Sequence, residues 1–154
     1  MRVKGRAELS GWQTMFAEFE KRTHEIAESG EALTIDVLRK EYRALLEKYF
    51  GPEMVLESVS DLEGLRIPHF YTAFYVYKYA TGLSASIALS ERVLHGGKDE
   101  RDAYLGFLKS GGSRFPIESL KLAGVDMSTP EPVQAACRRF AEDVEKLAVL
   151  MHKK

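Results

Sequence analysis

A stretch rich in aromatic residues, IPHFYTAFYVYKYATG at residues 67–82, holds the side chains best suited to binding a ligand. It contains six aromatic rings and one histidine, and no Asp or Glu balances its single lysine. Imidazole and phenol groups can donate hydrogen bonds to a bound ligand and accept them from it. Tyrosines buried in ordinary cores also find hydrogen-bond partners, so the composition by itself favours packing over ligand contact.

On a helix, the rings of this stretch would fall on two neighbouring stripes, because residues three and four apart share a face. One stripe contains Phe70, Phe74, Tyr77 and Thr81, and the next contains Tyr71, Tyr75, Lys78 and Gly82. The separation predicts a core-facing side that carries the phenylalanines and a neighbouring polar side that carries hydroxyl groups.

A second pattern, His24-Glu25-Ile26-Ala27-Glu28, differs by one residue from the HExxH motif of zinc peptidases. In that motif two histidines one turn apart bind the metal and the glutamate activates a water molecule. Here Glu28 replaces the second histidine, and a solvated helix face with charges four residues apart explains the same residues. The four histidines include no pair at helical spacing, and Cys137 is the only cysteine. The sequence therefore predicts no metal site and no internal disulfide in this chain.

Two helices are expected to come before the ring-rich stretch. Residues 12–29 place apolar side chains at helical spacing and end near Gly30. Thr34 offers a capping hydroxyl for a second helix, whose apolar positions begin at Ile35 and which stops at Gly51-Pro52. Together they predict a helical hairpin, followed by a connector over residues 51–68.

Pro68 suits the first turn of a helix, where its missing N–H would have no partner. The ring-rich stretch is therefore predicted to be the first half of a long helix from Pro68 to Leu94. Shorter helices are expected over residues 99–110, with Ala103, Tyr104, Phe107 and Leu108 inward, and from Pro116, with Ile117, Leu120 and Leu122 as its apolar side. The last helix follows Ser128-Thr129-Pro130-Glu131, and its apolar side comprises Val133, Ala136, Cys137, Phe140, Val144, Leu147, Ala148 and Met151.

No run of strand length with a period of two occurs, so the predicted fold class is all-α, a helical bundle. Nothing resembling a linker divides the chain, and one helical domain over residues 1–154 is expected. The 22 basic and 23 acidic residues nearly cancel, which disfavours binding to nucleic acid or to anionic membranes. The absence of a signal peptide and of long apolar runs favours a cytoplasmic location.

Several blocks of the sequence carry a resemblance that spacing alone does not provide. They are WQTMFAEFEKRTHEIAESGEALT, LLEKYFGP, RIPHFYTAFYVYKYATGLSASIAL and YLGFLKSGGSRFPIESLKLAGVDMSTPEPV, in that order. They resemble the C-terminal part of the oligoendopeptidase F family, which are zinc metallopeptidases similar to thimet oligopeptidase. The resemblance begins at about Trp12, which leaves residues 1–11 as a possible extension outside the family.

The resemblance implies an all-α, bowl-shaped peptidase that cleaves short peptides in a deep cavity. It also implies a single zinc ion, held by an HExxH helix and a later glutamate that lie upstream of the matched region. This chain has no HExxH, so zinc is expected in the full-length family and not in this chain.

The resemblance further implies that the ring-rich segment forms a wall opposite the zinc. In that setting Tyr77 and His69 are the first candidates to hydrogen-bond the oxyanion and the substrate, as catalytic groups that act only when a zinc-bearing half is present. Tyr71 and Tyr75 are the candidates for substrate binding. Phe70 and Phe74 are interpreted as packing residues.

Two functions are consistent with these observations. The chain can be a catalytic-domain segment of an oligoendopeptidase, inactive alone because the zinc ligands are absent and requiring its missing N-terminal half. Alternatively, it is a non-enzymatic helical module that keeps the substrate wall and binds short peptides or a partner protein. Both predict exposed apolar surface, and such surface favours self-association as a homodimer.

Overall fold

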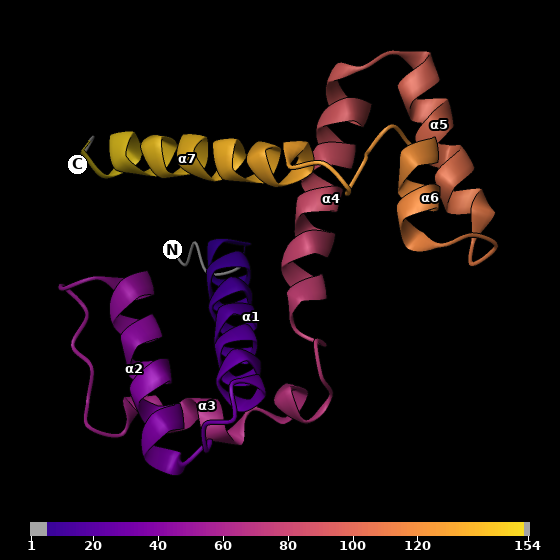
Figure 1. Ribbon diagram of the computed structural model, residues 1–154. Coiled ribbons are helices and arrows are strands. Elements are labelled where there is room, and N and C mark those ends of the chain that lie inside the picture. The colour runs from indigo at the N-terminus through magenta and orange to yellow at the C-terminus, as the bar shows by residue number, and fades with distance from the viewer. Residues whose placement is uncertain (1–5, 153–154) are drawn as a thin grey trace. The chain divides into compact units, whose positions relative to one another are not determined.

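The computed structural model describes residues 6–152, with side chains from residue 11, and every regular element in that range is helical (Figure 1). In chain order the elements are α1 (Arg6–Glu28), α2 (Ile35–Phe50), η1 (Ser60–Leu62), α3 (Glu63–Arg66), η2 (Pro68–Tyr71), α4 (Tyr77–His95), α5 (Lys98–Ser110), α6 (Pro116–Leu122) and α7 (Glu131–His152). The predicted all-α class is confirmed. Among these helices, none combines the length and the apolar character needed to span a bilayer.

The chain divides into two compact units, Met1–Ala80 and Thr81–Lys154. The boundary falls within the first turns of α4. All four residues proposed from the sequence as site residues belong to the first unit.

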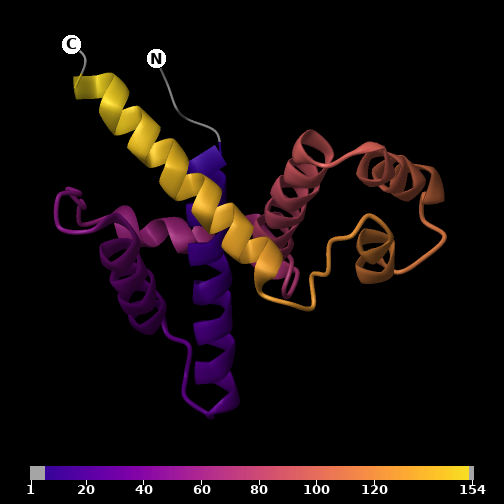
Figure 2. The same ribbon diagram turned by 90° about the horizontal axis from the view of Figure 1, so that it is seen from above.

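Helices α1 and α2 form the predicted hairpin, which can be followed in Figures 1 and 2. The Thr34 hydroxyl accepts a hydrogen bond from the N–H of Val37 at 3.3 Å, so the predicted cap is confirmed. Gly30 and Gly51 follow the two helices with φ angles of 86° and 73°, a conformation that glycine adopts without steric cost. Helix α1 begins at Arg6, earlier than predicted. Of the suggested N-terminal extension, residues 1–5 lie outside the described residues.

The core of the first unit lies between α1 and α2. Its buried members are Met15, Phe19, Tyr42, Leu45 and Leu46, and the rings of Trp12, Phe16, Tyr49, Phe50 and Phe70 pack around them. The Tyr42 ring meets Phe19 edge-on at 5.1 Å between centroids. The apolar spacing of both helices predicted these contacts. Ile35, at the start of α2, is exposed instead.

A polar network joins the two helices beside this core. The Glu18 carboxylate accepts hydrogen bonds from Lys48 at 2.8 Å, from Arg22 at 2.9 Å and from the Tyr49 hydroxyl at 2.9 Å. The Lys48 hydrogen bond is the main cause that holds the pKa of Glu18 below its ordinary value. Burial and the hydrogen bond to Glu18 raise the pKa of Tyr49 to about 12. Glu18 of α1 therefore links the two helices of the hairpin through Lys48 and Tyr49 of α2.

The predicted long helix from Pro68 to Leu94 is wrong in its first half. Pro68 does begin a helical turn, but η2 ends at Tyr71, and Thr72 is extended with φ −121° and ψ 102°. Phe74 then takes a positive φ of 56°, which a right-handed helix cannot contain. Its N–H donates to the side chain of Glu20 on α1, and α4 starts only at Tyr77. The two predicted stripes of rings therefore do not exist.

The second unit has a small core of Leu89, Ala123 and Val125, against which Tyr104, Phe107 and Leu120 pack. The predicted inward set is thus confirmed for Tyr104, Phe107 and Leu120. In contrast, Leu108, Ile117 and Leu122 are exposed. Helix α6 is only one to two turns long, so it buries one part of its apolar side and leaves the rest in solvent.

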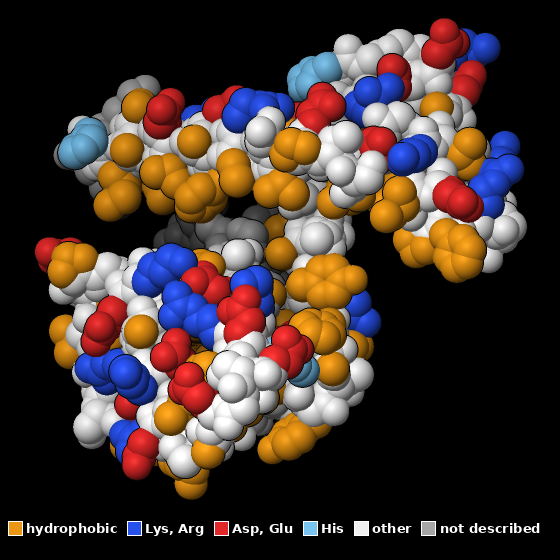
Figure 3. Space-filling view, in the orientation of Figure 1, with side chains coloured by type: hydrophobic (Ala, Val, Ile, Leu, Met, Phe, Trp, Pro, Cys, Tyr) orange, Lys and Arg blue, Asp and Glu red, His pale blue; other side chains and the backbone are white. Residues whose placement is uncertain are grey.

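Helix α7 exposes much of its apolar side. The exposed side chains along it include Val133, Cys137, Phe140, Val144, Leu147 and Met151. Figure 3 shows hydrophobic side chains gathered along the length of this helix. We call these six residues the α7 apolar face.

Candidate functional site

The ring-rich segment forms an aromatic cluster on the surface of the first unit. The His69 ring lies 5.3 Å from the Tyr75 ring and 6.1 Å from the Tyr79 ring, measured between centroids. Tyr75 and Tyr79 are themselves 5.7 Å apart, and the Lys78 ammonium lies over the Tyr75 ring at 3.4 Å. We call these four residues the His69 cluster. Three different short elements supply it: η2, the turn before α4, and the first turn of α4.

Hydrogen bonding makes the two phenols of the cluster unequal. The Tyr79 hydroxyl donates to the Tyr75 hydroxyl at 3.2 Å. This donated hydrogen bond, together with the charge of Lys78, holds the pKa of Tyr75 below its ordinary value. The same hydrogen bond raises the pKa of Tyr79, because ionisation would remove the proton that it donates. Tyr75 is therefore the more acidic phenol, and it remains accessible to solvent.

This arrangement predicts a pH-dependent behaviour that can be measured residue by residue. Tyr79→Phe removes the donated hydrogen bond, so the pKa of Tyr75 should rise towards that of a free tyrosine, near 10. Lys78→Met should raise it as well, because the neighbouring positive charge is lost. NMR titration of the tyrosine ring carbons measures both effects. Tyr104→Phe, in the second unit, is the control, and an unchanged Tyr75 titration in both cluster variants would contradict the assignment.

The other predicted residues of the segment occupy separate places. Tyr71 ends η2 and is 82% exposed. Tyr77 is the first residue of α4, and because residues two apart on a helix do not face each other, it lies on a different side from Tyr79. Phe70 packs on the core, as predicted. Phe74 stacks on His24 at 4.6 Å but is half exposed, so its packing is one-sided.

The local pattern that resembled HExxH takes part in other contacts. Glu25 pairs with Lys21 one turn earlier, Glu28 is exposed, and the His24 ring covers Phe74. Within residues 11–152, no three His, Cys, Asp or Glu side chains are gathered as ligands for a metal ion. The described part of the chain therefore does not fit a zinc site by itself.

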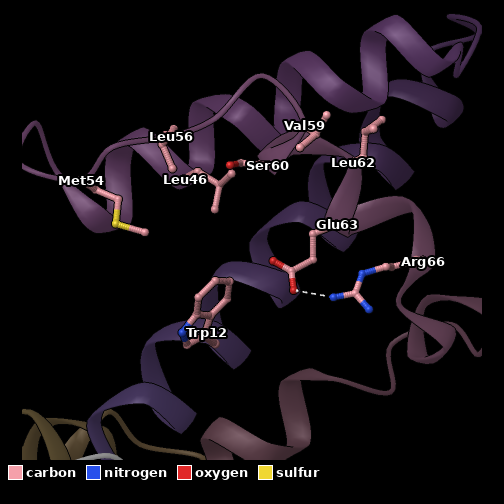
Figure 4. Close-up of a pocket in the computed structure, with 9 residues that line it drawn as sticks. All are labelled: Trp12, Leu46, Met54, Leu56, Val59, Ser60, Leu62, Glu63 and Arg66. Atoms are coloured by element: carbon pink, nitrogen blue, oxygen red, sulfur yellow. Dashed lines mark hydrogen bonds and ion pairs between the residues drawn. The ribbon is translucent and has the colours of Figure 1, made fainter.

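A shallow hollow of about 400 Å³ opens elsewhere on the first unit (Figure 4). Trp12, Leu46, Met54, Leu56, Val59 and Leu62 give it an apolar lining. Glu63 and Arg66 lie together at one side, joined by an ion pair of 3.3 Å. None of the four predicted site residues lines this hollow.

Two members of the His69 cluster, Lys78 and Tyr79, were missed as site candidates. The sequence carried a signal for Tyr79, since it lies four residues after Tyr75 and ends the same run of rings. Lys78 is the only charged residue of the ring-rich stretch, which also sets it apart. The resemblance drew attention to the residues before them.

Comparison with known proteins places the chain in a family. Residues 6–139 match the model of peptidase family M3. The chain belongs to peptidase family M3. It is 51% identical over 141 residues to the oligopeptidase PepF of Bacillus subtilis and 41% identical over 138 residues to an oligoendopeptidase F homolog of Borreliella burgdorferi. These matches cover 92% and 88% of the chain.

A similar protein of known structure has the same fold over the matched region. The crystal structure of oligoendopeptidase-F from Enterococcus faecium superposes with a TM-score of 0.91 at 37% sequence identity and covers 96% of the chain. The chain corresponds to 28% of that protein, to 21% of the Bacillus relative and to 23% of the Borreliella relative. The chain therefore spans about a quarter of the length of these similar proteins.

Proposed function

We propose that this chain forms the peptide-holding part of an oligoendopeptidase that hydrolyses short peptides. The His69 cluster supports this role, because it presents an imidazole, two phenol hydroxyls and an ammonium group to solvent in a chain of the M3 family. Such groups can hydrogen-bond the carbonyl and carboxylate oxygens of a short peptide. Exposed aromatic faces offer apolar contact area for its side chains.

Within this role the candidate residues have distinct tasks. His69 donates a hydrogen bond to the carbonyl that is cleaved, where negative charge develops during hydrolysis. Tyr77, which lies outside the His69 cluster, donates to another group of the substrate. Tyr71 and Tyr75 hold the rest of the peptide. Lys78, fixed over the Tyr75 ring, adds a positive charge beside the peptide path.

The family resemblance implies zinc, which would supply an activated water to the complete enzyme. Because the described residues do not fit a zinc site, the role proposed for this chain is limited to holding and orienting the peptide. We expect the chain alone to bind peptides without cleaving them.

Titration of a fluorescein-labelled octapeptide with the chain, followed by anisotropy, tests this function. Tyr77→Phe and His69→Ala should each weaken binding by about 2-fold to 10-fold, since one neutral hydrogen bond contributes ~0.5–1.5 kcal/mol. Tyr104→Phe is the matched control and should leave the affinity unchanged. A quenched-fluorescent peptide incubated with the chain, with and without added zinc, should show no turnover.

Two results would contradict the proposal. Absence of saturable binding would exclude the peptide-holding role, and equal affinity in all three variants would exclude these site residues. Cleavage by the chain alone that a chelator abolishes would show that the chain holds its own catalytic centre.

The α7 apolar face favours a second candidate function, the binding of a partner protein. A partner that covers this face can be the remaining part of a longer peptidase or a second copy of the chain. Light scattering of the purified chain separates these cases, because a second copy gives a dimer that Phe140→Glu disrupts.

A further inference from the structure

Phe74 has a backbone conformation that aromatic residues rarely adopt. Its φ of 56° makes it the only non-glycine residue with positive φ within the described part of the chain. In this region the Cβ atom of an L-residue comes too close to the backbone, so the conformation persists only where the surroundings hold it. Turns that need positive φ usually place glycine or asparagine there.

Glu20 of α1 holds the backbone of Phe74. Its carboxylate accepts a hydrogen bond from the N–H of Phe74 at 2.6 Å, across 54 residues of sequence. The Glu20 side chain is nearly inaccessible, with 4% of the residue exposed. A buried carboxylate is costly unless it is hydrogen-bonded, and a hydrogen bond to a charged acceptor is stronger than a neutral one. The hydrogen bond therefore offsets the burial of the Glu20 carboxylate and holds the backbone of Phe74.

His24 holds the side chain of the same residue. It lies one turn after Glu20 on the same face of α1, and its ring stacks on the Phe74 ring at 4.6 Å and 28°. Residues four apart on α1 thus fix both the backbone and the ring of Phe74. This contact also gives a role to the histidine of the HExxH-like pattern.

Phe74 directly precedes the candidate site residues. The turn that contains it closes with a hydrogen bond from the N–H of Tyr75 to the carbonyl of Thr72 at 3.2 Å. The next residue, Val76, is buried, and α4 begins at Tyr77. The conformation of Phe74 therefore sets the direction in which the chain leaves η2 and enters α4, and with it the placement of Tyr75 and Tyr77.

We propose that Glu20 and His24 are positioning residues for the peptide-holding site: by fixing Phe74 in its left-handed conformation, they keep Tyr75 against His69 and orient the start of α4. This inference rests on the proposed function. Neither residue has to touch the peptide, since both act through Phe74.

NMR of the isotope-labelled chain tests the inference without any ligand. In Glu20→Ala, the Phe74 amide proton should shift upfield and exchange with solvent at least ~10-fold faster, because its acceptor is gone. The ring resonances of Tyr75 and Tyr79 should move with it. Glu25→Ala, which removes an exposed glutamate of the same helix, is the matched control and should leave these resonances in place. Unchanged Phe74, Tyr75 and Tyr79 resonances in Glu20→Ala would overturn the inference.

Peptide affinity adds a readout that a general loss of stability would not reproduce. Glu20→Ala should weaken octapeptide binding by about 3-fold to 10-fold in the native background. In a Phe74→Gly background, Glu20→Ala should weaken octapeptide binding by less than about 2-fold, because glycine adopts positive φ without steric cost. An equal loss in both backgrounds would overturn the inference, since Glu20 would then act independently of residue 74.

The two proposals can fail separately. If the native chain binds no octapeptide, the proposed function fails, and the Phe74, Tyr75 and Tyr79 resonances still decide whether Glu20 positions the segment. If Glu20→Ala does not fold, Glu20→Gln decides, because its amide oxygen can still accept the hydrogen bond. In that variant the Phe74 amide proton should shift while the Tyr75 and Tyr79 ring resonances stay, and an unshifted amide proton would overturn the inference.

Discussion

Tyr42→Ala is expected to lower the free energy of unfolding of the first unit by about 3–5 kcal/mol, the usual cost of truncating a buried aromatic side chain to alanine. Tyr42 is completely inaccessible and is the largest fully buried side chain in the described part of the chain. Its ring contacts Phe16 and Phe19 of α1 from its position on α2, so its removal leaves a cavity where the two helices meet. Trp12, the only tryptophan, packs on the same core and reports unfolding in urea by fluorescence.

The matched control is Tyr42→Phe, which removes the hydroxyl and keeps the ring. This hydroxyl has no hydrogen-bond partner within the described residues, and burial raises the pKa of Tyr42. Removing an unpartnered polar atom does not break a hydrogen bond, so the change in unfolding free energy should stay within about 1 kcal/mol. If Tyr42→Phe lowers the free energy of unfolding as much as Tyr42→Ala does, then the hydroxyl makes a stabilising contact and the loss is not due to the ring.

Gly64→Ala should destabilise the first unit by about 1–3 kcal/mol through overpacking. Gly64 is buried in α3, and a Cβ atom added there would lie 2.5 Å from Cδ2 of Tyr42. Because the Tyr42 ring is enclosed on its other sides by the core, it cannot move away cheaply. Urea unfolding followed by Trp12 fluorescence again measures the loss.

Two further variants test whether the Tyr42 ring causes this loss. Gly11→Ala adds a methyl group on α1 where no described atom lies within 4 Å apart from its chain neighbours and the nearby backbone of α1, so it should stabilise the helix by roughly 0.5–1 kcal/mol. In a Tyr42→Leu background, Gly64→Ala should lower the free energy of unfolding clearly less than it does in the native chain. The two sites are in contact, so the effects of their substitutions are not additive. Equal costs in both backgrounds would show that the strain at residue 64 has another source.

Much of the fold follows from local patterns in the sequence. The α1–α2 hairpin was predictable because apolar residues repeat at helical spacing within each helix, for example Met15 and Phe19 in α1. Thr34 and Gly51 also mark the start and the end of α2. These signals act over a few residues, and the structure keeps them. The family resemblance then directed attention to His69 and Tyr75, which the structure brings together.

The ring-rich segment shows where local patterns fail. Nothing between Pro68 and Tyr77 signals that the helix should break over Thr72 to Phe74, since the segment has no internal glycine or proline. The break depends on Glu20, which in sequence looks like one more charged residue of an amphipathic helix. A single long-range hydrogen bond to a buried carboxylate outweighed the local preference, and no pattern within the segment could reveal it. The exposure of Leu108 and Leu122 was equally hidden, because periodicity identifies an apolar side but not what covers it.

The 54-residue separation between Glu20 and Phe74 also fixes an order of events during synthesis. A ribosome adds about 5–20 residues per second, so Glu20 is added to the growing chain roughly 3–11 s before Phe74. Through that interval the carboxylate lacks the partner that it has in the folded chain. The segment that carries the candidate site can therefore take its final course only on a hairpin that has already emerged, which makes the site one of the last parts of the first unit to form.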